Sequence, residues 1–179
     1  LNRSKDRFGA LWAERFKSVL VEGDAFALRT VAAYIDLNAV RAGLVEDPKD
    51  YRFCGYGEAM GGSRAAREGL KAIDRDLAGY RQTLYGSGSG EKEEKASISR
   101  EEAVRVLEKE KGKLPLSVVL RCRVRYFTDG MILGSPEFVE EQSAGMDPCG
   151  KRPRRPHPMR GANWGGMAVG TGLRSRLFR

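Results

Sequence analysis

Hydrophobic and polar residues alternate over the stretch "ERFKSVLVE", from Glu14 to Glu22. A two-residue period places one set of side chains on each face of a strand, so this stretch predicts a half-buried β-strand. Apolar residues then recur at helical spacing, between Asp24 at an N-cap position and Gly43, a residue type common where helices end. This pattern predicts a helix over Ala25–Ala42.

Turn residues around Pro48 separate this helix from a second periodic stretch, Ser63–Leu84. That stretch predicts a second helix, interrupted by glycines. The composition then changes to "YGSGSGEKEEKAS", a Gly/Ser run followed by charged residues, which is typical of a flexible linker. The linker, residues 86–98, divides the chain into two parts.

The second part begins with helix-start residues, which predict a helix over residues 99–111. Ser117–Phe127 mixes β-branched with basic residues and fits either a strand or a helix. Ser135 at an N-cap position and Pro136 at a first helical position predict a short helix within Leu133–Glu141. Short helices with clustered arginines suit either a DNA-binding appendage or a packing module.

The cysteines and the hydropathy narrow the class of protein. The 179 residues include three cysteines, and none of them shows the C-x-x-C spacing of a zinc site. Unpaired thiols are typical of a reducing compartment, so we expect a cytoplasmic protein. No apolar run approaches the roughly 18 residues that a membrane span needs, so we expect no membrane partner.

The net charge of +8 points to an anionic partner, for which nucleic acid is the commonest choice. Residues 151–179 contain eight Lys and Arg and no Asp or Glu, so this segment alone equals the whole surplus. Basic segments rich in Gly and Pro often stay unfolded, and we expect residues 146–179 to be a flexible basic tail. The candidate DNA-binding residues are Arg15, Lys17, Arg41, Arg121, Arg123, Arg125, Arg152, Arg154 and Arg155.

Tyr34 and Asn38 are four residues apart on the predicted helix, so they share a face, with Arg41 close to the same side. A phenol has a pKa of about 10 and is a poor nucleophile at neutral pH unless a metal or basic groups stabilise the phenolate. The amide oxygen of Asn38 is a candidate metal ligand, and Arg41 is suited to phosphate. Taken alone, Tyr34 is more simply interpreted as a core aromatic.

Two longer segments, "GALWAERFKSVLVEGD" and "YIDLNAVRAGLVEDPKDYRF", bear on this choice. They resemble the REP-associated and insertion-sequence single-tyrosine transposases, which are HUH-type enzymes that process single-stranded DNA. The resemblance covers about the first 85 residues, and "LRCRVRYFTDGMILGSPEFVEE" is similar to a C-terminal extension of some members. The residues that match the family pattern are Gly9, Leu11, Trp12, Arg15, Phe16, Tyr34, Ile35, Asn38, Val40, Arg41, Ala42, Gly43, Leu44, Val45, Pro48 and Tyr51.

The resemblance implies a chemistry and a fold. By position, Tyr34 is the nucleophile that forms a 5′-phosphotyrosine link, and Asn38 is a ligand of a divalent metal (Mg or Mn) otherwise held by two histidines. The family fold is a ferredoxin-like βαββαβ sheet. We therefore expect an α+β chain in which residues 1–85 form an incomplete ferredoxin-like transposase core. After the linker, residues 99–145 would form a small, mainly helical region, followed by the tail.

The chain also departs from the family pattern. The paired histidines are expected on a strand before the Trp12 segment and are not in this sequence, whose only histidine is His157. An amide oxygen alone does not hold a magnesium ion firmly, so we expect that the chain alone neither holds the metal nor cleaves DNA. The family's Asn-Pro is Asn38-Ala39 here, and Cys54-Gly55 replaces a frequent Ser pair.

These observations predict a transposase-like protein that binds single-stranded or hairpin DNA for strand cleavage and transfer, as a truncated or inactive copy. The alternatives are a non-catalytic DNA-binding module and a nonfunctional remnant. The expected partners are DNA and either a second copy or a full-length relative, whose metal site Tyr34 would serve in trans. Trp12 and Tyr51 either stack on bases or pack in a core, and packing is the simpler interpretation.

Overall fold

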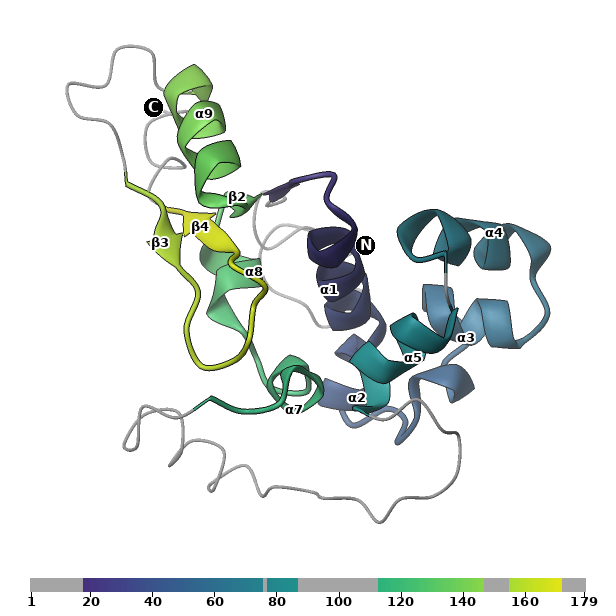
Figure 1. Cartoon of the computed structure of the whole chain (residues 1–179). Coiled ribbons are helices and arrows are strands. Elements are labelled where there is room, and N and C mark those ends of the chain that lie inside the picture. Colours follow the sequence, from purple (N-terminus) through teal and green to yellow (C-terminus); the bar gives the residue numbers. More distant parts are fainter. Residues whose placement is uncertain (1–17, 76, 87–112, 147–154, 172–179) are drawn as a thin grey trace, which may run out of the picture.

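The structure is a computed structural model that describes residues 18–75, 77–86, 113–146 and 155–171. These residues form eight α-helices, one 3-10 helix and a four-stranded mixed sheet, which confirms the α+β class. Figure 1 shows the helices α1 to α5 gathered on one side, and the sheet with α9 on the other. Among the described helices, none combines the length and apolar character that crossing a membrane requires.

The first strand and helix follow the predicted order. Strand β1 spans Leu20–Val21, and α1 spans Ala25–Asp36. The Asp24 carboxylate accepts hydrogen bonds from the backbone N–H groups of Phe26 and Ala27, at 2.9 and 3.1 Å, so the predicted N-cap is confirmed. The rest of the predicted strand, before residue 18, lies outside the described residues.

The predicted helix Ala25–Ala42 is interrupted at Leu37, and α2 (Asn38–Arg41) continues beyond the break. The guanidinium of Arg41 donates a 2.8 Å hydrogen bond to the Tyr34 carbonyl, which in a straight helix would accept from the N–H four residues on. The side-chain bond therefore compensates for the interruption. Gly43 has a φ of 69°, as the predicted helix end requires.

The middle of the first part is a cluster of short helices. The 3-10 helix η2 (Pro48–Asp50) leads to α3 (Gly55–Met60), which the sequence pattern did not predict, and then to α4 (Arg64–Ile73) and α5 (Leu77–Tyr85).

The predicted helix Ser63–Leu84 is divided into α4 and α5, but not at its glycines, because Gly69 and Gly79 both lie inside helices. The break follows Ile73, where the Asp74 carboxylate forms a 3.1 Å ion pair with Arg29 of α1. The break between α4 and α5 thus coincides with a tertiary contact to α1. The prediction that glycines interrupt the helix was wrong.

After the undescribed residues 87–112, the ambiguous stretch Ser117–Phe127 falls in two short helices, α7 (Leu116–Leu120) and α8 (Arg125–Asp129), joined by the non-helical residues 121–124. Strand β2 (Ile132–Gly134) precedes α9 (Pro136–Met146). The Ser135 hydroxyl accepts a hydrogen bond from the Phe138 N–H at 3.2 Å, so the predicted helix start is confirmed. The predicted linker and the predicted helix 99–111 lie outside the described residues.

The sheet joins both parts of the chain. Strands β3 (His157–Pro158) and β4 (Ala168–Gly170) complete it, in the order β1-β2-β4-β3. Strand β1 pairs with β2 in parallel, with Leu20 opposite Ile132, and β4 is antiparallel to both of its neighbours.

Residues 155–171 differ from the predicted flexible tail, because they form this strand pair. Met159, Trp164, Met167 and Val169 are buried and supply the apolar surface that holds the segment against the rest of the protein. Residues 147–154 and 172–179 of the predicted tail lie outside the described residues.

One hydrophobic cluster contains residues from both sides of the predicted linker. Leu37, Tyr56 and Leu84 come from the first part, and Leu120 and Trp164 come from the second. The predicted division at residues 86–98 therefore does not separate two cores.

Candidate functional site

Tyr34 is half-buried on α1 and has two close neighbours. The Arg41 guanidinium carbon lies 3.7 Å from the Tyr34 ring centroid, and the Phe127 ring of α8 lies 4.6 Å from it, between centroids. Phe127 in turn packs edge-on against Trp164, with centroids 5.9 Å apart. The surroundings of the predicted nucleophile thus come from both parts of the chain.

Arg41 links three elements. Besides its bond to the Tyr34 carbonyl, it donates a 2.8 Å hydrogen bond to the carbonyl of Leu120 at the end of α7. Burial lowers the pKa of Arg41, and the neighbouring Tyr34 and Cys122 offset part of that effect. Because its donors are directed at backbone carbonyls, Arg41 holds α1, α2 and α7 together.

Asn38 is exposed at the start of α2, and its amide oxygen accepts a long hydrogen bond, 3.4 Å, from Arg41. The three residues that the sequence places on one helical face, Tyr34, Asn38 and Arg41, are therefore brought together, with Arg41 in contact with both of the others.

A groove lies beside Asn38, between α1–α2 and the loop Tyr51–Gly55, and its volume is about 310 Å³. Three large hydrophobic side chains line it and are exposed: Ile35 by 61%, Leu44 by 63% and Phe53 by 73%. Exposed apolar side chains that gather at one groove are a feature of binding surfaces. We call this feature the Phe53 groove.

The Phe53 groove was not predicted from the sequence. Tyr51 and Phe53 meet edge-on with centroids 5.6 Å apart, and the Arg52 guanidinium carbon lies 4.8 Å from the Phe53 centroid. The aromatic–basic–aromatic order "YRF" is the signal that identifies it, because nucleic-acid-binding surfaces combine aromatic rings with cations. Tyr51, for which core packing was preferred, is half-buried and lines this groove.

A polar network lies beneath the groove. The Tyr80 hydroxyl donates a 2.5 Å hydrogen bond to Asp36, which is only 4% exposed. The Cys54 thiol donates to the Pro48 carbonyl at 3.3 Å and accepts from the Gly57 N–H, also at 3.3 Å. Burial and the adjacent Asp36 raise the pKa of Tyr80 well above its usual value, so this phenol stays protonated.

The donors near Asn38 do not fit a divalent metal. No group of three or more His, Cys, Asp or Glu side chains occurs within the described ranges, and the nearby Asp36 carboxylate is bound to Tyr80. His157 lies in β3 and is exposed. A single amide oxygen does not provide the oxygen ligands that Mg²⁺ requires, so no step is assigned to a metal held by these residues.

Three of the predicted DNA-binding arginines, Arg121, Arg123 and Arg125, differ in their exposure to solvent. Arg121 is half-buried and donates a 3.2 Å hydrogen bond to the Leu84 carbonyl, whereas Arg123 and Arg125 are exposed. These two lie on the short segment between Leu120 and Phe127, the residues that contact Arg41 and Tyr34. We call Tyr34, Asn38, Arg41 and Phe127 the Tyr34 cluster, and the segment that carries Arg123 and Arg125 borders it.

The remaining predicted contacts add little to this site. Arg155 is exposed just before β3. The predicted contacts that lie outside the described residues are Trp12, Arg15, Lys17, Arg152 and Arg154.

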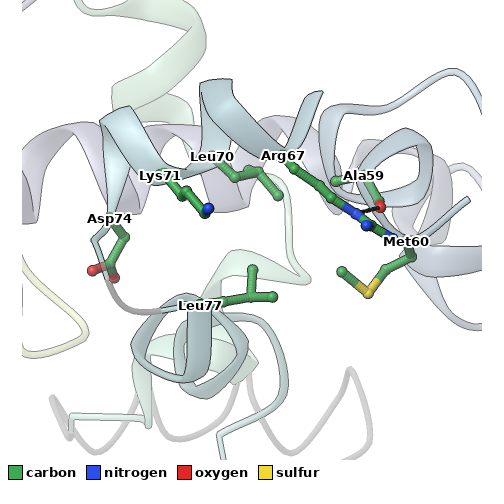
Figure 2. A pocket seen from close by; sticks show the side chains of 7 residues that line it. All are labelled: Ala59, Met60, Arg67, Leu70, Lys71, Asp74 and Leu77. Atoms are coloured by element: carbon green, nitrogen blue, oxygen red, sulfur yellow. Dashed lines mark hydrogen bonds between the residues drawn. The ribbon is translucent and has the colours of Figure 1, made fainter. Parts of the chain in front are cut away.

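A smaller cavity lies between α3, α4 and α5 (Figure 2). Its volume is about 100 Å³, well below the several hundred Å³ typical of ligand pockets. Figure 2 shows Leu77 pointing from α5 toward Leu70 and Met60, while Arg67 is bonded to the Ala59 carbonyl at 2.9 Å. This cavity is a packing feature of three helices.

Comparisons with protein-family models, with curated proteins and with solved structures found no match. The Tyr34 cluster and the Phe53 groove are therefore the features from which a function can be argued.

Proposed function

We propose that this chain binds single-stranded or hairpin DNA as a single-tyrosine, transposase-type protein, with Tyr34 at its reactive centre. The observation that carries the proposal is the position of Arg41, which contacts Tyr34 and Asn38 and also bonds to Leu120. That contact brings the segment between Leu120 and Phe127, which carries the exposed Arg123 and Arg125, close to the tyrosine helix.

The charge favours a nucleic-acid strand as the ligand. Exposed arginines bind phosphates without regard to sequence, and the chain as a whole carries a net charge of +8. We propose that Arg123 and Arg125 hold phosphates of a strand that passes Tyr34. Because Arg41 is engaged with carbonyls, we assign it to positioning Tyr34 rather than to holding a phosphate.

We propose further that β1 belongs to a ferredoxin-like core of the transposase type. In its favour, β1 directly precedes the tyrosine helix and lies at the edge of the described sheet, where additional strands would extend it. Measurement of amide protection in β1, alone and with a full-length relative, tests whether another chain completes this edge.

DNA binding is tested by titrating the whole chain with a fluorescent single-stranded oligonucleotide at several salt concentrations. Each phosphate contact contributes about −0.7 to the slope of log K against log salt for single strands. The double variant R123A/R125A is therefore expected to make the slope shallower by about 1.4. The matched control R64A/R75A removes two exposed arginines on and beside α4 and should leave the slope nearly unchanged. Equal losses in both variants, or no binding by the wild type at low salt, would contradict the proposal.

Strand cleavage is proposed only in trans. The test mixes this chain with a full-length relative that carries the histidine pair but has its own tyrosine replaced by phenylalanine, together with magnesium and a hairpin-flanked oligonucleotide. We expect a covalent DNA adduct on this chain that is absent with Tyr34→Phe. DNA binding without any adduct would favour the alternative, a non-catalytic DNA-binding module.

A further inference from the structure

We propose that the Phe53 groove binds one unpaired nucleobase, stacked on Phe53 and hydrogen-bonded to the carboxamide of Asn38. This inference rests on the proposed function, because it specifies how the same surface contacts single-stranded DNA. It also assigns Asn38 a role in base recognition, in place of the role in metal binding that the family resemblance implies.

The exposed apolar surface is concentrated at this groove. Of the five large hydrophobic side chains that are exposed in the described residues, three line it: Ile35, Leu44 and Phe53. Exposed apolar patches of this kind mark binding sites. An aromatic ring at the surface provides a stacking platform for a base, whatever the identity of the base.

The polar groups at the groove fit a nucleotide better than an apolar peptide. The Asn38 carboxamide has both a donor and an acceptor, which is the combination that pairs with a base edge. The Arg52 guanidinium lies over the Phe53 ring, 4.8 Å from its centroid, so the base is assigned to the other face of the ring. Arg52 then adds a cation that can hold a phosphate of the bound strand. The volume of about 310 Å³ is at the lower end of the range for small-molecule sites.

The groove is pre-formed, which favours binding because little ordering is needed. Cys54 and Ala39 in its lining are buried, and the Cys54 thiol caps α3. A Cβ atom on Gly55 would lie 3.5 Å from the Asp36 carboxylate, which the bond to Tyr80 holds in place. The ligand must be unpaired, since a base in a duplex presents only its edges to a protein.

The test compares the affinity of the whole chain and its variants for a labelled single-stranded oligonucleotide. Phe53→Ala is expected to weaken binding about 5- to 100-fold, as the loss of one stacked base does, whereas Phe53→Trp should retain it. Asn38→Ala should also lower the affinity for the oligonucleotide. Leu20→Ala is the matched control, because Leu20 is also an exposed large hydrophobic residue, 38% exposed, and lies in β1 outside the lining of this groove. Its effect should stay within about twofold.

A second arm uses an oligonucleotide in which abasic sites replace the bases. The wild type should bind it at least as weakly as Phe53→Ala binds the normal strand, because an abasic strand lacks both the stacked ring and the partner of Asn38. Phe53→Ala should lose less affinity than the wild type when the bases are removed, because its stacking contact is already absent. If Phe53→Ala and Asn38→Ala bind single strands as tightly as the wild type does, the base site is refuted and the DNA-binding proposal stands. If the wild type binds no single strand, both fail. A thermal midpoint unchanged by Phe53→Ala shows that the variant remains folded.

Discussion

The guanidinium of Arg41 donates a 2.8 Å hydrogen bond to the backbone carbonyl of Leu120, 79 residues further along the chain. The same side chain stacks on Tyr34 and bonds to the Tyr34 carbonyl. A single residue thus connects the tyrosine helix to the second part of the protein. The connection determines which side chains surround the tyrosine, so both stability and the proposed function depend on it.

Arg41→Lys is expected to lower the free energy of unfolding by about 2 kcal/mol, because an ammonium cannot stack in the same way or reach both carbonyls at once. Urea denaturation followed by circular dichroism measures the change. Arg52→Lys is the control, since Arg52 is exposed and its described contact is with the Phe53 ring. Equal stability of the two variants would show that Arg41 does not link the two parts.

Gly57 and Gly69 should respond in opposite directions to the same substitution. A Cβ atom on Gly57 would overlap the Tyr51 carbonyl and lie 2.9 Å from the Pro48 carbonyl oxygen, whereas one on Gly69 would meet nothing within 4 Å. Gly57→Ala should therefore destabilise the protein by more than about 2 kcal/mol. Gly69→Ala, inside α4, should stabilise it by roughly 0.5–1 kcal/mol. Thermal denaturation of both variants tests this, and a tolerated Gly57→Ala would contradict the packing of α3 against η2.

Tyr80→Phe removes the partner of a buried carboxylate. Asp36 is 4% exposed and accepts a 2.5 Å hydrogen bond from the Tyr80 hydroxyl, so its desolvated charge would lose that bond. We expect a loss of about 2–3 kcal/mol in the free energy of unfolding, measured by urea denaturation at neutral pH. Tyr126→Phe is a useful control, because the Tyr126 hydroxyl bonds to the exposed Arg160 N–H. A loss no larger than that of the control would argue against the Asp36–Tyr80 pair as a support of the groove.

The hydroxyls of Tyr80 and Tyr85 make the free energy of unfolding depend on pH in the alkaline range. Burial and Asp36 raise the pKa of Tyr80, and burial and Asp47 raise the pKa of Tyr85. Above about pH 10 the unfolded chain loses these protons while the folded chain keeps them. Their contribution is therefore complete below about pH 10 and is lost as the pH rises, by up to about 1.4 kcal/mol per pH unit for each group.

Urea midpoints measured between about pH 9 and pH 11 should fall for the wild type and fall less steeply for Tyr80→Phe, because one of the two groups is gone. Parallel slopes for the two proteins would show that Tyr80 titrates alike in the folded and unfolded chain.

Local features were predictable from the sequence because they depend on neighbouring residues. The Asp24 cap, the helix end at Gly43 and the Ser135 start of α9 each need only residues within one turn, and the structure confirms all three. The turn after Ile73 was misplaced, since it coincides with an ion pair to a different helix rather than with a glycine.

The candidate site was predictable only in part. The spacing of Tyr34 and Asn38 along one helix implies that they share a face, and the structure keeps them together through Arg41. The Phe53 groove could not be predicted, because it requires the loop Tyr51–Gly55 to lie against α1, and no periodicity in the sequence encodes the position of a loop.

The sequence by itself determined the helical environment of Tyr34, the caps that delimit its helix, and the positive charge that favours an anionic partner. Only the tertiary structure decided that Phe127 packs on that tyrosine, that Trp164 packs on Phe127, and that residues 155–171 join the sheet. The reason is physical: caps and helical faces arise from residues a few positions apart. The neighbours of Tyr34 follow from burying apolar surface of both parts in one core, which couples residues far apart in the chain.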